Sequence, residues 1–229
     1  MIRIILLASF ILLFISCQKE TKNQLNPKSE LQKEEPELSI PEKIAYAHGF
    51  DQWNKVNKIS FTFNVDHDSS HYERNWIWFP KENKVSFKSA SDSLTYFRKN
   101  MDSLIQKTDS GFINDKYWLL LPYNLIWDKN NYSFTHTTNV LSPIAKNKMQ
   151  KLTIVYANEG GYTPGDAYDI YFEDNFKLKE WVFRKGNAKE ASLATTWEDY
   201  TVLNGLKIAQ SHQKDSGNWK LHFTNLKVE

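Results

Sequence analysis

Cys17 is the only cysteine in the 229-residue sequence, and its position predicts a specific covalent modification. It follows an apolar run, residues 4–15, that begins just after the positive charge of Arg3, and the chain becomes polar immediately after it. A charged start, an apolar stretch of about 7–15 residues and a small residue before the cleavage site are typical of a secretory signal peptide. We therefore predict that residues 1–16 are a lipoprotein signal peptide and that Cys17 is the site of lipid attachment.

Acylation of Cys17 would also account for the absence of a disulfide. An unpaired thiol is a liability in an oxidising compartment, and acylation removes it. The alternative is an ordinary buried thiol, since Phe14 and Ile15 are not the residue types preferred before a lipidated cysteine. Stable anchoring needs two or more acyl chains. We expect a membrane partner through N-terminal acyl chains, such as palmitate, and a location on either face of the outer membrane.

Two histidines and two aspartates crowd residues 66–71, whose sequence is Asp-His-Asp-Ser-Ser-His. Imidazole and carboxylate groups suit zinc and similar ions. Aspartate and serine are also common in hairpin turns, which need no metal. We assign no metal here, and the sequence leaves open whether the turn that carries His67 and His71 binds one.

Catalytic and cofactor motifs are missing from the sequence. It has no Gly-x-Ser-x-Gly, no His-Glu-x-x-His, no phosphate-binding glycine loop and no second cysteine. Loss of residues 1–16 removes only Arg3 and leaves one excess positive charge, which argues against a nucleic-acid partner. We predict a protein that is not an enzyme and needs no cofactor.

The order of residue types divides the chain into three parts, of which the first is the predicted signal peptide, residues 1–16. Residues 17–40 are rich in Lys, Glu, Gln and Asn, contain no aromatic residue, and are predicted to be a disordered lipidated tether. Residues 41–229 hold all eight tryptophans and form a domain large enough for a substantial core.

Hydrophobic periodicity predicts the first elements of this domain. A helix starts near Pro41, and a strand over 58–65 alternates apolar and polar residues. A second helix is predicted from Asp92 to a point before Gly111, followed by a hairpin over 112–121. The remaining stretch, 122–149, is expected to be an irregular loop, with a helical turn around 123–127, that covers the site as a lid.

The C-terminal third predicts a regular series of antiparallel strands. Gly- and Asn-containing turns, among them Asn204-Gly205, separate them. A twisted sheet of that size tends to curl. We expect a mainly β (α+β) fold, a single antiparallel up-and-down sheet of about ten or eleven strands that forms an open half-barrel, with two or three helices plugging or lidding the concave face. The predicted C-terminal strands are 151–157, 167–173, 177–184, 193–202, 206–213 and 218–228.

Aromatic residues on these strands are the candidates for lining a cavity. Large apolar side chains dominate ligand sites in barrel-like folds, although the same residues also fill ordinary cores. The candidate ligand-lining residues are Phe61, Phe63, Trp76, Trp78, Trp118, Trp181 and Trp197.

Several sequence blocks carry a resemblance to known proteins; they are residues 47–53, 117–128, 161–172, 180–186 and 195–200. In these blocks the chain resembles an uncharacterised family of outer-membrane lipoproteins from Bacteroidetes-type bacteria. More distantly, its expected architecture is similar to the carrier and receptor of the lipoprotein-sorting (Lol) system, half-barrels that hold acyl chains in an apolar concave face. That resemblance implies, by analogy of fold, a hydrophobic or acyl-chain-containing ligand.

Two functions from different classes remain. One is a lipid-anchored module that binds a hydrophobic ligand in the half-barrel cavity, without catalysis. The other is an envelope scaffold whose core is fully packed and whose surface binds an envelope protein partner. An apolar cavity of several hundred Å³ would favour the first.

Overall fold

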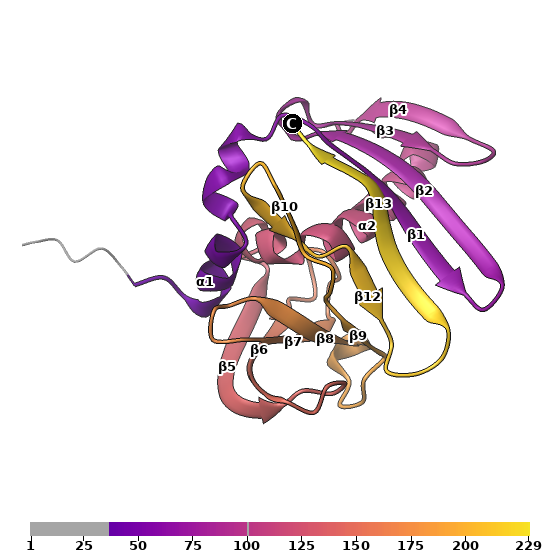
Figure 1. Ribbon diagram of the computed structural model, residues 1–229. Coiled ribbons are helices and arrows are strands. Elements are labelled where there is room, and N and C mark those ends of the chain that lie inside the picture. Colours follow the sequence, from indigo (N-terminus) through magenta and orange to yellow (C-terminus); the bar gives the residue numbers. More distant parts are fainter. Residues whose placement is uncertain (1–36, 100) are drawn as a thin grey trace, which may run out of the picture. The chain divides into compact units, whose positions relative to one another are not determined.

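The computed structural model describes residues 37–99 and 101–229 (Figure 1). The predicted signal peptide, Cys17 and nearly all of the predicted tether therefore lie outside the described residues. Within the described part of the chain, no helix is both long enough and apolar enough to cross a bilayer.

The first large sheet has six antiparallel strands, most of them from the N-terminal part of the domain. Its spatial order is β12 (Ser211–Gln213), β13 (Trp219–Val228), β1 (Ile59–His67), β2 (Ser70–Phe79), β3 (Lys84–Lys88) and β4 (Ser93–Phe97). A short 3₁₀ turn, η2 (Pro80–Glu82), links β2 to β3.

The second sheet has five antiparallel strands in simple sequence order. They are β5 (Tyr132–Leu141), β6 (Lys148–Tyr156), β7 (Ala167–Phe172), β8 (Leu178–Arg184) and β9 (Leu193–Thr196), with η3 (Lys185–Asn187) between the last two. The hairpin of β10 (Thr201–Leu203) and β11 (Leu206–Ile208) is separate from both sheets. Asn204 and Gly205 both have positive φ at its turn, as predicted for Asn-Gly.

The two sheets join where the chain passes from β9 to β12. An isolated bridge pairs Glu198 with Ser211, and the backbone N–H of Gln213 donates to Thr196 Oγ1 at 3.0 Å. The opposite edges, β4 and β5, are not paired with each other in the described residues. The predicted open half-barrel is thus confirmed, but as two joined sheets and a hairpin, because 193–202 and 206–213 each divide into two short strands.

The regular pattern of β1 places its alternate side chains in the core, as predicted. Ile59, Phe61 and Phe63 are buried, and Phe61 lies opposite Trp76 of β2. Trp78 lies opposite Ile59, so the two tryptophans share one face of the sheet.

Helix α1 (Ile40–Ala47) begins where the sequence predicts a helix. Pro41 occupies its first turn, and the Ser39 backbone N–H donates to Glu42 Oε2 at 2.9 Å. Such a return contact satisfies a free N–H at the helix start. The next turn, η1 (Phe50–Lys55), follows Gly49, whose φ of 89° favours glycine.

Helix α2 (Ser103–Trp127) corrects three predictions. Residues 93–97 form β4, and the helix begins only after Asp102, whose side chain accepts from the Ile105 N–H at 2.9 Å. The helix then continues through Gly111, so the predicted hairpin over 112–121 is wrong. The predicted irregular lid is also wrong, because 122–149 contains the end of α2, all of β5 and the start of β6.

The apolar run over 117–121 explains the error, because a continuous apolar run fits a buried strand and a buried helix equally well. All five of these residues are buried on a helix that has non-helical angles at Leu120, φ −126° and ψ 29°, two residues before Pro122. A proline inside a helix removes one backbone hydrogen bond and bends the helix there.

Candidate ligand-binding site

Helix α2 runs between the two sheets and fills the middle of the half-barrel (Figure 1). The Phe112 ring lies 5.5 Å from Trp76 and 5.7 Å from Trp78, both on β2 of the six-stranded sheet. The Trp118 ring lies 4.5 Å from Trp181 on β8 of the other sheet. These contacts pack the centre of the concave face, so space for a ligand lies beside the helix.

One such space is a cleft of about 370 Å³ between the first half of α2 and strands β2 to β4. We call it the α2–β3 cleft. Its walls are mostly apolar, and Leu104 on its rim is 68% exposed. The lining residues are Tyr72, Arg74, Trp76, Phe87, Asp92, Ser93, Leu94, Leu104, Lys107, Thr108 and Gly111.

A largely buried ion pair holds Arg74, one of the residues that line this cleft, against α2. Arg74 donates through Nε to Asp115 Oδ2 at 2.8 Å and through Nη2 to Oδ1 at 2.5 Å. The Trp76 indole N–H also donates to Oδ2 at 2.7 Å. Burial raises the pKa of Asp115, and the charge of Arg74 opposes that rise. One α2 carboxylate thus fixes two β2 side chains that line the cleft.

A second ion pair attaches β4 to the same helix. Arg98 donates through Nε to Asp109 Oδ1 at 2.8 Å, and the Tyr96 hydroxyl donates to the same oxygen at 3.0 Å. Burial and the neighbouring carboxylate raise the pKa of Tyr96, so its hydroxyl keeps the proton that it donates. The wall formed by β4 is therefore held against α2 by directional contacts.

The predicted ligand-lining residues are distributed over several places. Trp76 lines the α2–β3 cleft. Trp118 and Trp181 line a cleft of about 240 Å³ on the other side of α2, together with Tyr162 and Tyr168. We call this second space the Trp181 cleft.

The other predicted residues lie elsewhere. Trp78 lines a third cleft, near the end of α2, of about 290 Å³. Phe61, Phe63 and Trp197 are buried in the core cluster and line none of these three clefts.

Sequence reasoning missed most of the α2–β3 cleft. Leu94 and Leu104 both fall within the single helix predicted from Asp92 to a point before Gly111, but they line the cleft from a strand and from a helix. Phe87 and Thr108 carried no recognisable signal. The sequence predicts that a helix ends before Gly111, but Gly111 lies within α2 and leaves its side of the helix open to Arg74 and Trp76.

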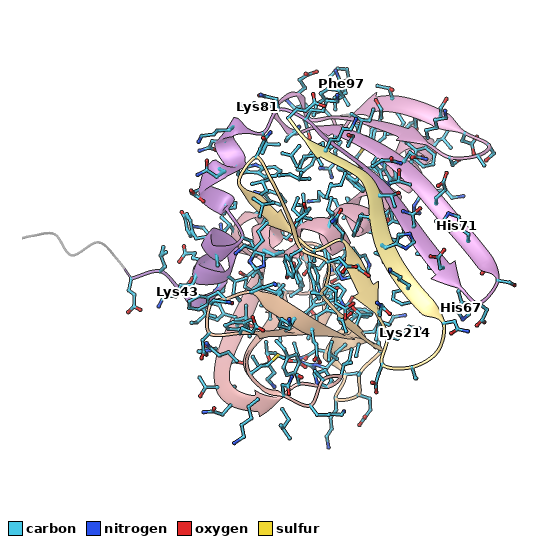
Figure 2. The ribbon with its side chains drawn as sticks, in the orientation of Figure 1. Lys43, His67, His71, Lys81, Phe97 and Lys214 are labelled. Atoms are coloured by element: carbon cyan, nitrogen blue, oxygen red, sulfur yellow. The ribbon has the colours of Figure 1, made fainter. Side chains whose placement is uncertain are left out.

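The histidine-rich turn is a set of surface ion pairs. Figure 2 shows His67 and His71 near the turn between β1 and β2. His71 Nδ1 lies 2.6 Å from Asp66 Oδ1, and this contact raises the pKa of His71 and lowers that of Asp66. Across residues 37–99 and 101–229, no three His, Cys, Asp or Glu side chains are arranged to hold a metal ion.

Comparison with solved structures identifies the fold. A LolA superfamily protein from Nitrosomonas europaea aligns with a TM-score of 0.51 at 12% identity, covering 83% of this chain and 92% of that one. The chain has a LolA-like fold. At this identity the likeness shows the fold alone, and it confirms the predicted resemblance to the Lol architecture.

Two further structures resemble this LolA-like fold less closely. They are a DUF1329 family protein from Desulfovibrio piger and an outer membrane lipoprotein-sorting protein domain from Vibrio parahaemolyticus. Each aligns with a TM-score of 0.44 at 9% identity, covering 82% of this chain and 92% or 93% of the other chain. No protein-family model and no curated protein matches the sequence. The resemblance to a Bacteroidetes-type family stays a prediction.

Proposed function

We propose that this chain is an envelope protein that binds the acyl chain or a similar apolar part of a ligand in the α2–β3 cleft, without catalysis. The single observation that carries the proposal is the cleft itself, a mainly apolar space of about 370 Å³ against α2. Small-molecule sites are usually apolar clefts of about 300–1,000 Å³ with a few polar groups. This cleft has those properties.

The exposure of the rim supports an apolar occupant. Leu104 is 68% exposed although it borders the cleft, and Tyr72 is 51% exposed. Covering a leucine side chain contributes about 1.5–3 kcal/mol. A ligand lying between these residues and Trp76 would gain this energy without any change in the packed core.

The polar groups of the cleft favour a ligand with a polar end. Arg74, Asp92 and Lys107 line it beside the apolar residues. Arg74 is already paired with Asp115, so Lys107 is the cationic side chain that a ligand headgroup would meet at the rim. The LolA-like fold is consistent with an acyl ligand by analogy only.

The direct test fills the cleft with a large side chain. Thr108→Trp is expected to weaken dodecanoate binding at least tenfold, because the indole would occupy the space between α2 and β3. Isothermal titration calorimetry on the chain without residues 1–17, which keeps every described residue, measures this.

Ser110→Trp is the matched control for that test. Ser110 is exposed on the same helix and does not line the cleft. Its hydroxyl donates to a backbone carbonyl of α2, as the Thr108 hydroxyl also does. We expect Ser110→Trp to change the dissociation constant less than about twofold. Equal binding by the two variants, or no binding by the unchanged chain, would contradict the proposed function.

We further propose that Cys17 anchors this binding module to the outer membrane. The support is its position after an apolar run in the sequence. Metabolic labelling with an alkyne fatty acid is expected to mark the full chain and to leave Cys17→Ala unmarked. Label on the Cys17→Ala variant would refute Cys17 as the attachment site.

The second candidate function is docking of another envelope protein, and β5 favours it. This edge strand is ten residues long, has no Asp, Glu, Lys or Arg, and is exposed along most of its length. Uncharged edge strands accept additional strands. A lysine in this strand, as in Thr135→Lys, would then abolish the association of a partner while leaving dodecanoate binding intact.

A further inference from the structure

The cleft near the end of α2 combines indole rings with cations. Its volume is about 290 Å³, and we call it the Lys116 cleft. Its walls come from η1, the end of β2 with η2, the chain after β4, and α2. The lining residues are Trp53, Trp78, Pro80, Arg98, Lys116 and Trp127.

Three indoles surround this cleft at different inclinations. The Trp53 ring lies 4.7 Å from Trp127 and 5.5 Å from Trp78. Trp78 and Trp127 are 6.0 Å apart with an interplanar angle of 86°. Trp53 and Trp127 are only partly buried, so their rings retain surface that a ligand could cover. Aromatic surface of this kind suits a flat or apolar ligand body.

Lys116 points its ammonium group at these rings. Its Nζ lies 4.8 Å from the centre of Trp127 and 5.7 Å from that of Trp78, and it donates to Asn124 Oδ1 at 3.1 Å. No carboxylate oxygen of the described residues lies within 4.0 Å of it. Burial, followed by repulsion from Arg98, lowers the pKa of Lys116 to about 8. An ammonium with three donors thus has one neutral acceptor.

Arg98, the second cation of the cleft, pairs with the nearby carboxylate of Asp109, so Asp109 does not pair with Lys116. Arg98 binds Asp109 through Nε at 2.8 Å and Nη2 at 3.1 Å, and Tyr96 adds a third contact to that carboxylate. The charge of Asp109 is therefore matched by Arg98. The carboxylates of Asp128 and Asp109 attract the Lys116 ammonium group from a distance and partly oppose the lowering of its pKa, but neither forms an ion pair with it. The ammonium group therefore keeps donors for a ligand in a partly buried, aromatic setting, where a charge-assisted hydrogen bond is strong.

We propose that the Lys116 cleft binds a small organic carboxylate with a flat apolar body, whose carboxylate accepts hydrogen bonds from the Lys116 ammonium group while its body lies against Trp53 and Trp127. This site is distinct from the α2–β3 cleft and does not depend on acyl-chain binding there. The competing explanation is that Lys116 only packs on the indoles as a cation–π contact. In that case an anion and a neutral molecule of the same shape would bind alike.

The experiment compares 1-naphthoate with 1-naphthamide, which have nearly the same shape and differ in charge. Titration calorimetry on the full chain in detergent, with a detergent-only titration subtracted, is expected to show naphthoate binding at least tenfold more tightly. Equal affinity for the two probes, or no binding of naphthoate, overturns the proposal. This arm needs no variant and is independent of any folding defect.

Two variants locate the site. Lys116→Met keeps the apolar stem but removes the charge, and it is expected to lower naphthoate affinity to that of naphthamide. Lys129→Met removes a positive charge from an exposed position just beyond α2 and is expected to leave both affinities within twofold. Unchanged naphthoate binding by Lys116→Met overturns the proposal.

Thr108→Trp separates this site from the proposed acyl site. It is expected to leave naphthoate binding unchanged while it weakens dodecanoate binding at least tenfold. Loss of naphthoate binding in Thr108→Trp would place the probe in the α2–β3 cleft and overturn the Lys116 site. Loss of dodecanoate binding alone has no effect on the inference, so the two proposals fail separately.

Discussion

Replacing Asp115 by leucine is expected to lower the free energy of unfolding by about 3–5 kcal/mol, because removing one partner of a buried ion pair leaves the other uncompensated. The Asp115 side chain has no exposed surface, and Arg74 keeps 22% of its side-chain surface exposed. The Trp76 indole N–H would lose its acceptor as well. This is the largest destabilisation that we expect from a single side chain next to the α2–β3 cleft.

Urea denaturation followed by tryptophan fluorescence measures the effect. The control is the double variant Arg74→Met with Asp115→Leu, which removes both charges. We expect it to be about 2 kcal/mol more stable than Asp115→Leu, since the uncompensated charge of Arg74 is then gone and only the neutral N–H donors of Trp76 and Asn114 have lost their acceptor. A double variant no more stable than the single would show that Asp115 acts by packing and not by pairing with Arg74.

Acidification from pH 7 to pH 5 is expected to destabilise the fold through two buried histidines. Burial lowers the pKa of His48 to about 4 and that of His212 to about 3. Because the unfolded chain binds these protons near pH 6.5 and the folded chain does not, stability is fully present above about pH 6.5 and falls as the pH drops towards the folded values. Each histidine accounts for a loss of about 2 kcal/mol over this range.

The surroundings of the two histidines explain why they stay neutral. The His48 ring Nδ1 lies 2.8 Å from Ile44 O, and His212 Nδ1 lies 3.0 Å from Thr196 O, contacts that suit a neutral imidazole donating at Nδ1. His212 also lies 4.5 Å from the Trp197 ring at the joint between the sheets. A second positive N–H there would have no acceptor among the described residues.

The measurement is the free energy of unfolding at pH 7, 6 and 5, for the unchanged chain and for His48→Gln. The variant is expected to lose about 2 kcal/mol less than the unchanged chain between pH 7 and pH 5. His136→Gln, at an exposed position on β5, is the control and should leave the pH dependence as it is. Parallel pH curves for all three chains would contradict buried, neutral His48.

Local patterns predicted those parts of the fold that depend on neighbouring residues. The alternation over 58–65 predicted β1, Pro41 marked the first turn of α1, and Asn204-Gly205 marked a hairpin. In each case the residues that form the sequence pattern are the same residues, or close neighbours of the residues, that form the element. The open half-barrel followed from the number and spacing of such signals.

Helix α2 was not predictable in the same way. Its run over 117–121 is buried all round because two sheets enclose it, and such a run has no amphipathic period. The position of α2 against the two sheets determines which side chains line a cleft and which are packed in the core. Trp76 and Trp78 were both predicted to line one cavity and do share a face of the sheet, but with α2 packed against them they line two different clefts, and Phe112 contacts both rings.

The most direct test of the central claim is photolabelling with a palmitate analogue that carries a diazirine on its alkyl chain, followed by peptide mapping of the intact protein. The account predicts label on residues 104–111 of α2 and on the facing parts of β2, β3 and β4, and loss of that label in Thr108→Trp but not in Ser110→Trp. Label confined to the Trp181 cleft, or equal labelling of both variants, would contradict it.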